Sequence, residues 1–149
     1  MLHRVFEEGL VALLNAHAVA TENLCKEYRK AVDASAIVSI SDLTGVITFA
    51  NDLFCEISGY EREELIGKPH SIVRHPDMDK AVFEELWRTI RQKQVWRGAL
   101  KNRKKNGDAY WVNTTITPIL GLNGEIREYI SVRWEIPDPT AFCENLESL

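Results

Sequence analysis

A chain of 149 residues is long enough for one domain with a hydrophobic core and leaves room for a helical extension. Hydrophobic residues (45%) and charged residues (27%) stand in globular proportions, and a net charge of -4 argues against a nucleic-acid-binding surface. No apolar run reaches the length of a membrane span, and the three cysteines lack metal-type spacing. We therefore expect a reduced, soluble, cytoplasmic protein without direct membrane contact.

The first 31 residues predict one long amphipathic helix, from about Leu2 to Ala31. Apolar or small residues recur in it at alternating steps of four and three, which is a heptad register that slips near Glu27 and Tyr28. Such a stripe needs a partner surface, either the chain's own domain or the helix of a second copy. We expect it to serve both as a cap and in a homodimer. The stripe consists of Phe6, Leu10, Leu13, His17, Ala20 and Leu24.

Residues 32–136 predict an α+β domain built on a five-stranded antiparallel sheet, with short helices on one face. Asn-Gly pairs at 106–107 and 123–124 predict two hairpin turns. A ligand pocket is expected between sheet and helices, and residues 137–149 are expected to connect to an output domain. The expected strands are 36–40, 46–49, 96–103, 109–120 and 125–136, and the expected helices are 52–58, 61–66 and about 79–92.

The densest group of site-type residues is Arg74-His75-Pro76-Asp77-Met78, just before the helix at 79–92. Arg74 offers a charged fork of donors, and His75 can donate or accept near neutral pH. Pro76 stiffens the turn, and Asp77 stands where the helix N-cap is expected. Composition alone leaves two interpretations open: a solvated loop with a capped helix, or part of a ligand site.

Further motifs decide between these interpretations. The stretch from about Val32 to Glu135 resembles a PAS sensor domain, and within that superfamily the FAD-binding type of bacterial aerotaxis receptors. The matching segments are 49–52 (FAND), 58–60 (SGY), 64–67 (ELIG), 69–70 (PH), 73–78 (VRHPDM), Trp87, Trp96, 101–103 (KNR), 105–107 (KNG) and 110–112 (YWV).

The resemblance implies non-covalent FAD in a module for redox or oxygen-linked signalling of the aerotaxis or energy-taxis type. Arg74 suits the phosphates, Asn102 the polar edge of the isoalloxazine ring, and Trp96 could line or stack on that ring. Arg133 takes the position of a flavin-contacting glutamine in light-sensing relatives, where a cation would favour the anionic reduced flavin. The other implied cofactor-binding residues are His75, Asp77, Asn51 and His70.

Alternatives remain open at this point. A haem-binding PAS sensor would use His70 or His75 as axial ligand, and an empty PAS domain could act only in dimerisation. A light sensor with a cysteinyl adduct is not expected, because Cys55 lies in the wrong helix. An enzyme is not expected either, because no Ser/His/Asp or metal-binding set appears. The output domain could be a chemoreceptor, a kinase or a cyclase. Asn51 and Asp77 could equally be helix caps, and Trp87 could be core.

The two faces of the sheet are expected to differ. If Asn102 and Arg133 point inward, the period of two sends Ile130, Val132 and Trp134 to the outer face. An apolar outer face needs a cover, so we expect it to join the N-terminal helix in the homodimer.

Overall fold

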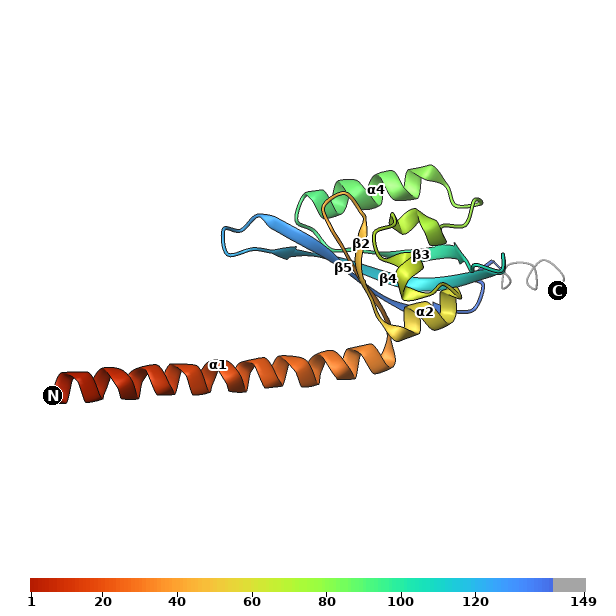
Figure 1. Cartoon of the computed structure of the whole chain (residues 1–149). Coiled ribbons are helices and arrows are strands. Elements are labelled where there is room, and N and C mark those ends of the chain that lie inside the picture. Colours follow the sequence, from red (N-terminus) through yellow and green to blue (C-terminus); the bar gives the residue numbers. More distant parts are fainter. Residues whose placement is uncertain (141–149) are drawn as a thin grey trace. The chain divides into compact units, whose positions relative to one another are not determined.

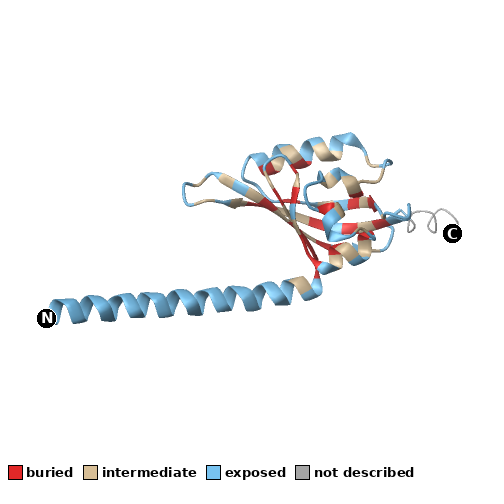
Figure 2. Ribbon diagram, viewed as in Figure 1, coloured by how far each residue is buried: buried red, intermediate tan, exposed pale blue. Residues whose placement is uncertain are grey.

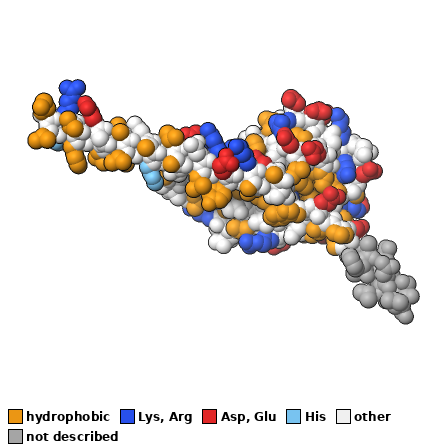
Figure 3. Space-filling view, turned by 90° about the horizontal axis from the view of Figure 1, so that it is seen from below, with side chains coloured by type: hydrophobic (Ala, Val, Ile, Leu, Met, Phe, Trp, Pro, Cys, Tyr) orange, Lys and Arg blue, Asp and Glu red, His pale blue; other side chains and the backbone are white. Residues whose placement is uncertain are grey.

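The computed structural model describes residues 1–140 and divides the chain into two units, which meet between Ser35 and Ala36. The first unit is the single helix α1 (Leu2–Ser35), which continues four residues beyond the expected end at Ala31. None of its residues is buried (Figure 2), and hydrophobic side chains recur along its surface (Figure 3). Within residues 1–140, no helix combines the length and the apolar character that a membrane span requires. Most of the expected connector, residues 141–149, lies outside the described part.

The second unit is organised on a five-stranded sheet in which all neighbouring strands are antiparallel (Figure 1). The spatial order is β2-β1-β5-β4-β3, so the first and the last strand of the domain, β1 and β5, pair with each other inside the sheet. The hairpin at Asn106-Gly107 has the strand bounds that its sequence predicts. The strands are β1 (Ile37–Ser41), β2 (Ile47–Ala50), β3 (Trp96–Arg103), β4 (Ala109–Leu120) and β5 (Ile126–Ile136).

Short helices between β2 and β3 cover one face of this sheet (Figure 1). Asn51 caps the first of them by accepting the Phe54 N–H, and Gly59 ends it with a φ of 76° that suits glycine. The second and fourth follow the expected pattern, whereas the third is a four-residue 3₁₀ helix in a stretch for which no element was predicted. They are α2 (Asp52–Ser58), α3 (Arg62–Leu65), η1 (His70–Val73) and α4 (Lys80–Arg91).

The N-cap of α4 differs from the expectation. Asp79, not Asp77, caps the helix, and its carboxylate accepts the Ala81 N–H at 2.9 Å. Asp77 cannot reach the first turn because the loop carries it toward β3 instead, where it meets Lys101 at 3.2 Å. The prediction of Asp77 as the cap was therefore wrong by two residues.

The inner face of the sheet packs against the helices and forms the core, in which Ile47, Phe54 and Val112 are fully buried (Figure 2). The outer face carries the side chains that period two assigns to it. On β5, Ile130 and Val132 are half-buried and Trp134 is 48% exposed. Cover of this face by a second copy stays a prediction.

Candidate functional site

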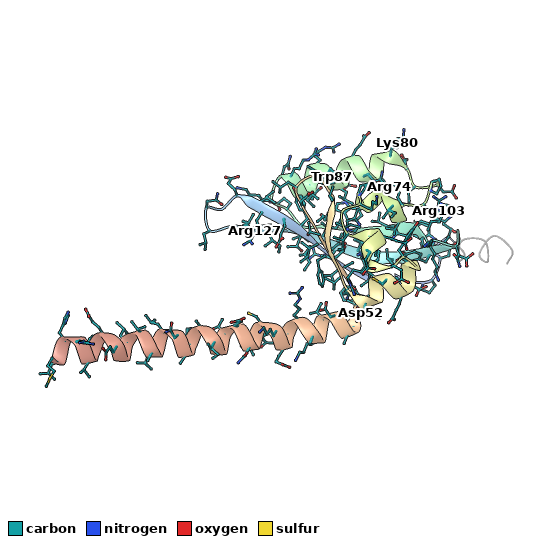
Figure 4. All side chains as sticks on the ribbon, viewed as in Figure 1. Asp52, Arg74, Lys80, Trp87, Arg103 and Arg127 are labelled. Carbon is teal, nitrogen blue, oxygen red and sulfur yellow. The ribbon has the colours of Figure 1, made fainter. Side chains whose placement is uncertain are left out.

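A cavity of about 280 Å³ lies between the inner face of the sheet, η1 and α4. Its floor is formed by β3, β4 and β5, and its roof by the apolar stripe of α4. Figure 4 shows Arg74 and Trp87 on the side of α4 that faces the sheet. The lining residues are Ser41, Thr44, Gly45, Pro69, His70, Ser71, Val73, Arg74, Phe83, Leu86, Trp87, Ile90, Leu100, Asn102, Thr114, Ile116, Tyr129, Ser131 and Arg133.

Backbone pairing brings Arg74 and Asn102 to the same point of the cavity wall. The two residues form an isolated antiparallel bridge, which attaches the loop after η1 to β3. One residue further on, the His75 N–H donates to the Lys101 carbonyl at 3.2 Å. Two segments that lie 28 positions apart in the sequence thus present a guanidinium and an amide to one cavity.

The side chains of His75 and Asp77 fasten this loop and do not line the cavity. The Asp77 N–H donates to His75 Nδ1 at 3.1 Å, and the Asp77 carboxylate pairs with the Lys101 ammonium on β3. The Met78 sulfur accepts the Lys101 N–H at 3.4 Å. These contacts hold the backbone of Arg74 against β3, so the side chains of His75 and Asp77 support the position of Arg74.

Arg133 is a buried cation at the centre of the sheet, with 3% of its surface exposed. Its Nη2 donates to the Ser39 hydroxyl at 2.7 Å, and its guanidinium carbon lies 4.3 Å from the centroid of the Phe54 ring. No carboxylate of residues 1–140 pairs with it. Burial lowers the pKa of Arg133 to about 10, so the guanidinium still carries its charge at neutral pH.

His70 shares the Ser39 hydroxyl with Arg133. Its Nε2 lies 2.9 Å from the Ser39 oxygen, and its ring stacks on Phe54 with an interplanar angle of 16°. Burial, helped by the charges of Arg133 and Arg74, lowers the pKa of His70 to about 3. The His70 ring is therefore neutral and shares the Ser39 hydroxyl, whose oxygen also accepts from Arg133.

Unsatisfied polar atoms concentrate at this cavity. Four buried side-chain atoms in residues 1–140 lack a hydrogen-bond partner, and three of them belong to cavity-lining residues: Arg74 Nε, Thr114 Oγ1 and Arg133 Nε. Buried polar groups normally find partners, because an unpaired one costs about 1–3 kcal/mol. No lining residue is acidic. The cavity therefore suits a ligand that offers hydrogen-bond acceptor atoms and that is anionic or readily becomes anionic.

A more open groove of about 710 Å³ runs along α4 and shares three residues with the cavity. Two of these are aromatic, and each carries a guanidinium: Arg74 lies 3.5 Å above the Phe83 ring, and Arg91 lies 4.9 Å above the Trp87 ring. Four of the groove residues are cations and one is acidic. They are Arg74, Lys80, Phe83, Glu84, Trp87, Arg88, Arg91 and Gln92.

The structure thus brings four of the predicted site residues to the cavity, namely His70, Arg74, Asn102 and Arg133, and places four outside its lining. Trp96 shares the inner face of β3, as expected, but its ring lies over Gly98 in the core, where an added Cβ would come within 2.6 Å of it. The amide of Asn51 is used within the fold: besides its capping bond, it accepts the Val38 N–H and donates to the Ala36 carbonyl.

Several polar residues at the cavity or directly behind its lining were not predicted from the sequence. Ser39 connects Arg133 and His70, and Ser41, Thr114 and Ser131 face the cavity from three adjacent strands. Their signal is small hydroxyl side chains at inward positions, where a filled core would carry large apolar ones. Trp87, which was interpreted as core, also lines the cavity, and it meets Tyr129 edge to face.

Known proteins share sequence with this chain. A family model described as the PAS fold matches residues 47–133. The aerotaxis receptor of Escherichia coli (strain K12) is 45% identical over 106 residues, which is 71% of this chain and 21% of the receptor. The nitrogen fixation regulatory protein of Klebsiella pneumoniae is 33% identical over 103 residues, 69% of this chain and 21% of that protein. The chain thus spans about a fifth of the length of these curated relatives.

A solved structure shares the fold. It is a light-oxygen-voltage domain studied with a flavin analogue, and it superposes with a TM-score of 0.70 at 22% identity. The match covers 85% of this chain and 95% of that one. The expected sheet with its covering helices is therefore confirmed.

Proposed function

Because this chain belongs to the PAS family of domains, we propose that it is a sensor module that binds FAD in the cavity and reports the flavin redox state to an output domain. Two relatives support the choice of signal and cofactor. One is an aerotaxis receptor, by its name a protein of oxygen-directed movement, and the other is a light-oxygen-voltage domain studied with a flavin analogue. The output domain would be a chemoreceptor, a kinase or a cyclase of the full-length protein.

The observation that supports the proposal most strongly is a cavity lined by two arginines, whose buried N–H groups lack hydrogen-bond partners, and by no acidic residue. Arg133 and Arg74 each keep a buried N–H without a partner, and Thr114 adds a hydroxyl without one. The isoalloxazine ring of a flavin has carbonyl oxygens and ring nitrogens on one edge, which these donors and the Asn102 amide can bind. The apolar roof formed by Leu86 and Ile90 suits the faces of the ring.

The dimensions favour a ligand that extends out of the cavity. A volume of about 280 Å³ is near the lower limit of small-molecule pockets, so it suits one ring system and not a whole dinucleotide. The groove along α4 continues from the cavity past Arg74, with Lys80, Arg88 and Arg91 along its length. Guanidinium groups bind phosphate oxygens in bidentate fashion. We assign the diphosphate and adenosine to this groove, which favours FAD over riboflavin.

Arg133 would set the redox behaviour of the site. Bound FAD supplies reversible electron transfer, and its reduced form gains negative charge. The charged guanidinium of Arg133, buried where screening by water is weak, stabilises negative charge in the cavity more than a neutral group could. We therefore expect Arg133 to raise the reduction potential.

The same side chain provides a route for the signal. Arg133 on β5 donates to Ser39 on β1, and Ser39 contacts His70 at the start of η1. A change in the electrostatic attraction between the flavin and Arg133 would weaken or strengthen these contacts together. In this proposal the flavin redox state alters the contacts between β1, β5 and η1, with no enzymatic step.

The geometry gives less support to the alternative functions, a haem sensor and a light sensor with a cysteinyl adduct. For a haem ligand, both candidate rings are already engaged: His70 with Ser39, and His75 with the Asp77 N–H. Cys55 packs against the hydrophobic core and is not among the cavity-lining residues, so a cysteinyl adduct has no support.

The test is the absorption spectrum of the purified chain, with the released cofactor identified by chromatography. We expect a flavin spectrum and FAD as the released molecule. In the variants Arg74→Ala and Asn102→Ala the flavin content should fall strongly while the melting temperature changes little. The exposed control Arg97→Ala on β3 should keep the wild-type flavin content and melting temperature. A haem spectrum, or a colourless chain that takes up no FAD, would refute the proposal.

A further inference from the structure

The groove along α4 collects cations that have no acidic partner. Its lining holds four cations and one acidic residue, although the whole chain has a net charge of -4. Elsewhere on the domain Lys101 and Lys105 each pair with a carboxylate, whereas within residues 1–140 none of the groove cations forms an ion pair. We propose that this groove binds free nucleoside diphosphates. The four cations are Arg74, Lys80, Arg88 and Arg91.

Two of these cations are held in place by aromatic rings. The guanidinium carbon of Arg74 lies 3.5 Å from the centroid of the Phe83 ring. That of Arg91 lies 4.9 Å from the centroid of the Trp87 ring. Stacking uses the flat faces of a guanidinium and leaves its N–H edge free to bind phosphate oxygens. Because both side chains are already ordered, they lose less conformational entropy when an anion binds.

The spacing of the two stacked guanidinium groups favours two linked phosphates over one. Phe83 and Trp87 lie four residues apart on α4, so they follow each other along one side of the helix at a rise of about 6 Å. The guanidinium groups stacked on them can bind neighbouring phosphates, each in bidentate fashion. Lys80, at the start of the helix (Figure 4), and Arg88 are exposed in the same groove and add two further charges.

The remaining features of the lining favour a nucleotide over an inorganic anion. Phe83 and Trp87 are half-buried and give the groove an apolar floor that a base or a ribose can cover. Gln92 follows the last residue of α4 and offers both a donor and an acceptor to the edge of a base. Glu84 is the acidic residue of the lining, and its carboxylate repels a polyanion, so it limits the affinity.

A free nucleoside diphosphate would compete with FAD because their binding sites overlap. In the proposed flavin site the ring lies in the cavity and the diphosphate in the groove, which share Arg74, Phe83 and Trp87. The nucleotide therefore displaces the tail of FAD and leaves the cavity open to a flavin ring. Flavin occupancy then falls as the free nucleotide concentration rises. This competition rests on the proposed function, whereas the nucleotide site itself does not.

Calorimetric titration of the flavin-free chain with ADP tests the site. ADP should bind about tenfold more tightly than AMP or inorganic phosphate, because its second phosphate engages the second guanidinium. Arg88→Glu should weaken ADP binding about tenfold or more, and Glu84→Gln should strengthen it about twofold.

The matched control is Arg97→Glu, an equal charge reversal at an exposed position of β3, which should bind ADP like wild type. The melting temperatures of the three variants should stay near that of wild type, because all three positions are exposed. Absence of ADP binding, inorganic phosphate bound as tightly as ADP, or an equal loss in Arg88→Glu and Arg97→Glu would overturn the proposal.

Competition against two flavins separates this inference from the flavin site. At an ADP concentration ten times its own dissociation constant, the apparent dissociation constant of FAD should rise about elevenfold, and that of riboflavin, which lacks the phosphate tail, should change less than about twofold. An equal effect of ADP on both flavins, or on neither, would overturn the inference. A chain that binds ADP but no FAD would refute the proposed function alone, and one that binds FAD but no ADP would refute this inference alone.

Discussion

The two units of this chain are incomplete in opposite ways. The helix α1 exposes apolar side chains that lack an apolar partner within their own unit, whereas the sheet unit buries polar side chains that lack polar partners. Exposed apolar surface is covered by another protein surface, and buried donors are satisfied by a small ligand. Each unit thus indicates the kind of partner it requires by the groups that it leaves unsatisfied.

The largest expected effect separates the two units by a matched pair of phenylalanines. Phe54 is fully buried in the core, and Phe6 is 71% exposed on α1. Phe54→Ala should lower the free energy of unfolding of the sheet unit by about 3–5 kcal/mol, because it leaves a cavity. Phe6→Ala should leave that free energy within about 0.5 kcal/mol of wild type and weaken self-association instead. Urea unfolding and sedimentation measure the two effects, and an equal loss of stability in both variants would erase the contrast.

Arg133→Met should separate stability from binding. Removing a buried charge without a carboxylate partner should raise the stability of the ligand-free chain by about 1 kcal/mol or more. The same change should weaken FAD binding about tenfold or more, because a charge-assisted hydrogen bond is lost. Thermal melting and fluorescence titration measure these two effects. Arg97→Met, on the exposed side of β3, should change neither, and a destabilised Arg133→Met chain would show that the guanidinium serves the fold.

The histidines predict a pH dependence that resides in the sheet unit. The pKa of His70 is about 3 in the folded chain against 6.5 for an ordinary histidine. Between these values the unfolded chain binds a proton that the folded chain does not. His70 therefore contributes stability that is complete above pH 6.5 and is lost as the pH falls toward 3. Urea midpoints between pH 4 and 8 should flatten in His70→Gln, and His17→Gln, on the exposed helix, should retain the wild-type slope.

The smallest expected effect distinguishes the two aspartates before α4. Asp79→Ala removes the N-cap and should cost about 1 kcal/mol. Asp77 is 70% exposed, so water screens its pairs with His75 and Lys101, and Asp77→Ala should cost less than about 0.5 kcal/mol. Its effect should appear in FAD retention, through the loop that holds Arg74. A larger loss of stability in Asp77→Ala than in Asp79→Ala would contradict the observed cap.

The strands and longer helices follow from the sequence because local chemistry defines them. The Asn106-Gly107 turn places β3 and β4 on either side of a hairpin, and Gly59 ends α2. The 3₁₀ helix at His70–Val73 is too short for any periodicity to show. Asp77 and Asp79 are chemically identical caps, and only the attachment of the loop to β3 decides between them.

The site could be predicted only in part, for a similar reason. Alternation assigns Asn102, Trp96 and Arg133 to the inner face correctly, but it does not fix the direction of a ring. The Trp96 ring lies over Gly98 of its own strand and does not line the cavity, whereas the Trp87 ring of α4 does. The role of Ser39 depends on β1 pairing with β5, two strands that are distant in the sequence.

The melting temperature of the flavin-free chain, measured with and without FAD, shows whether the buried donors form a flavin site. A ligand that satisfies the buried donors stabilises the folded state by about 2.7 kcal/mol at a concentration one hundred times its dissociation constant. We predict a clear upward shift in wild type and a much smaller one in Arg133→Met. An unchanged melting temperature with FAD, or an equal shift in both proteins, would contradict the claim that these donors are a flavin site.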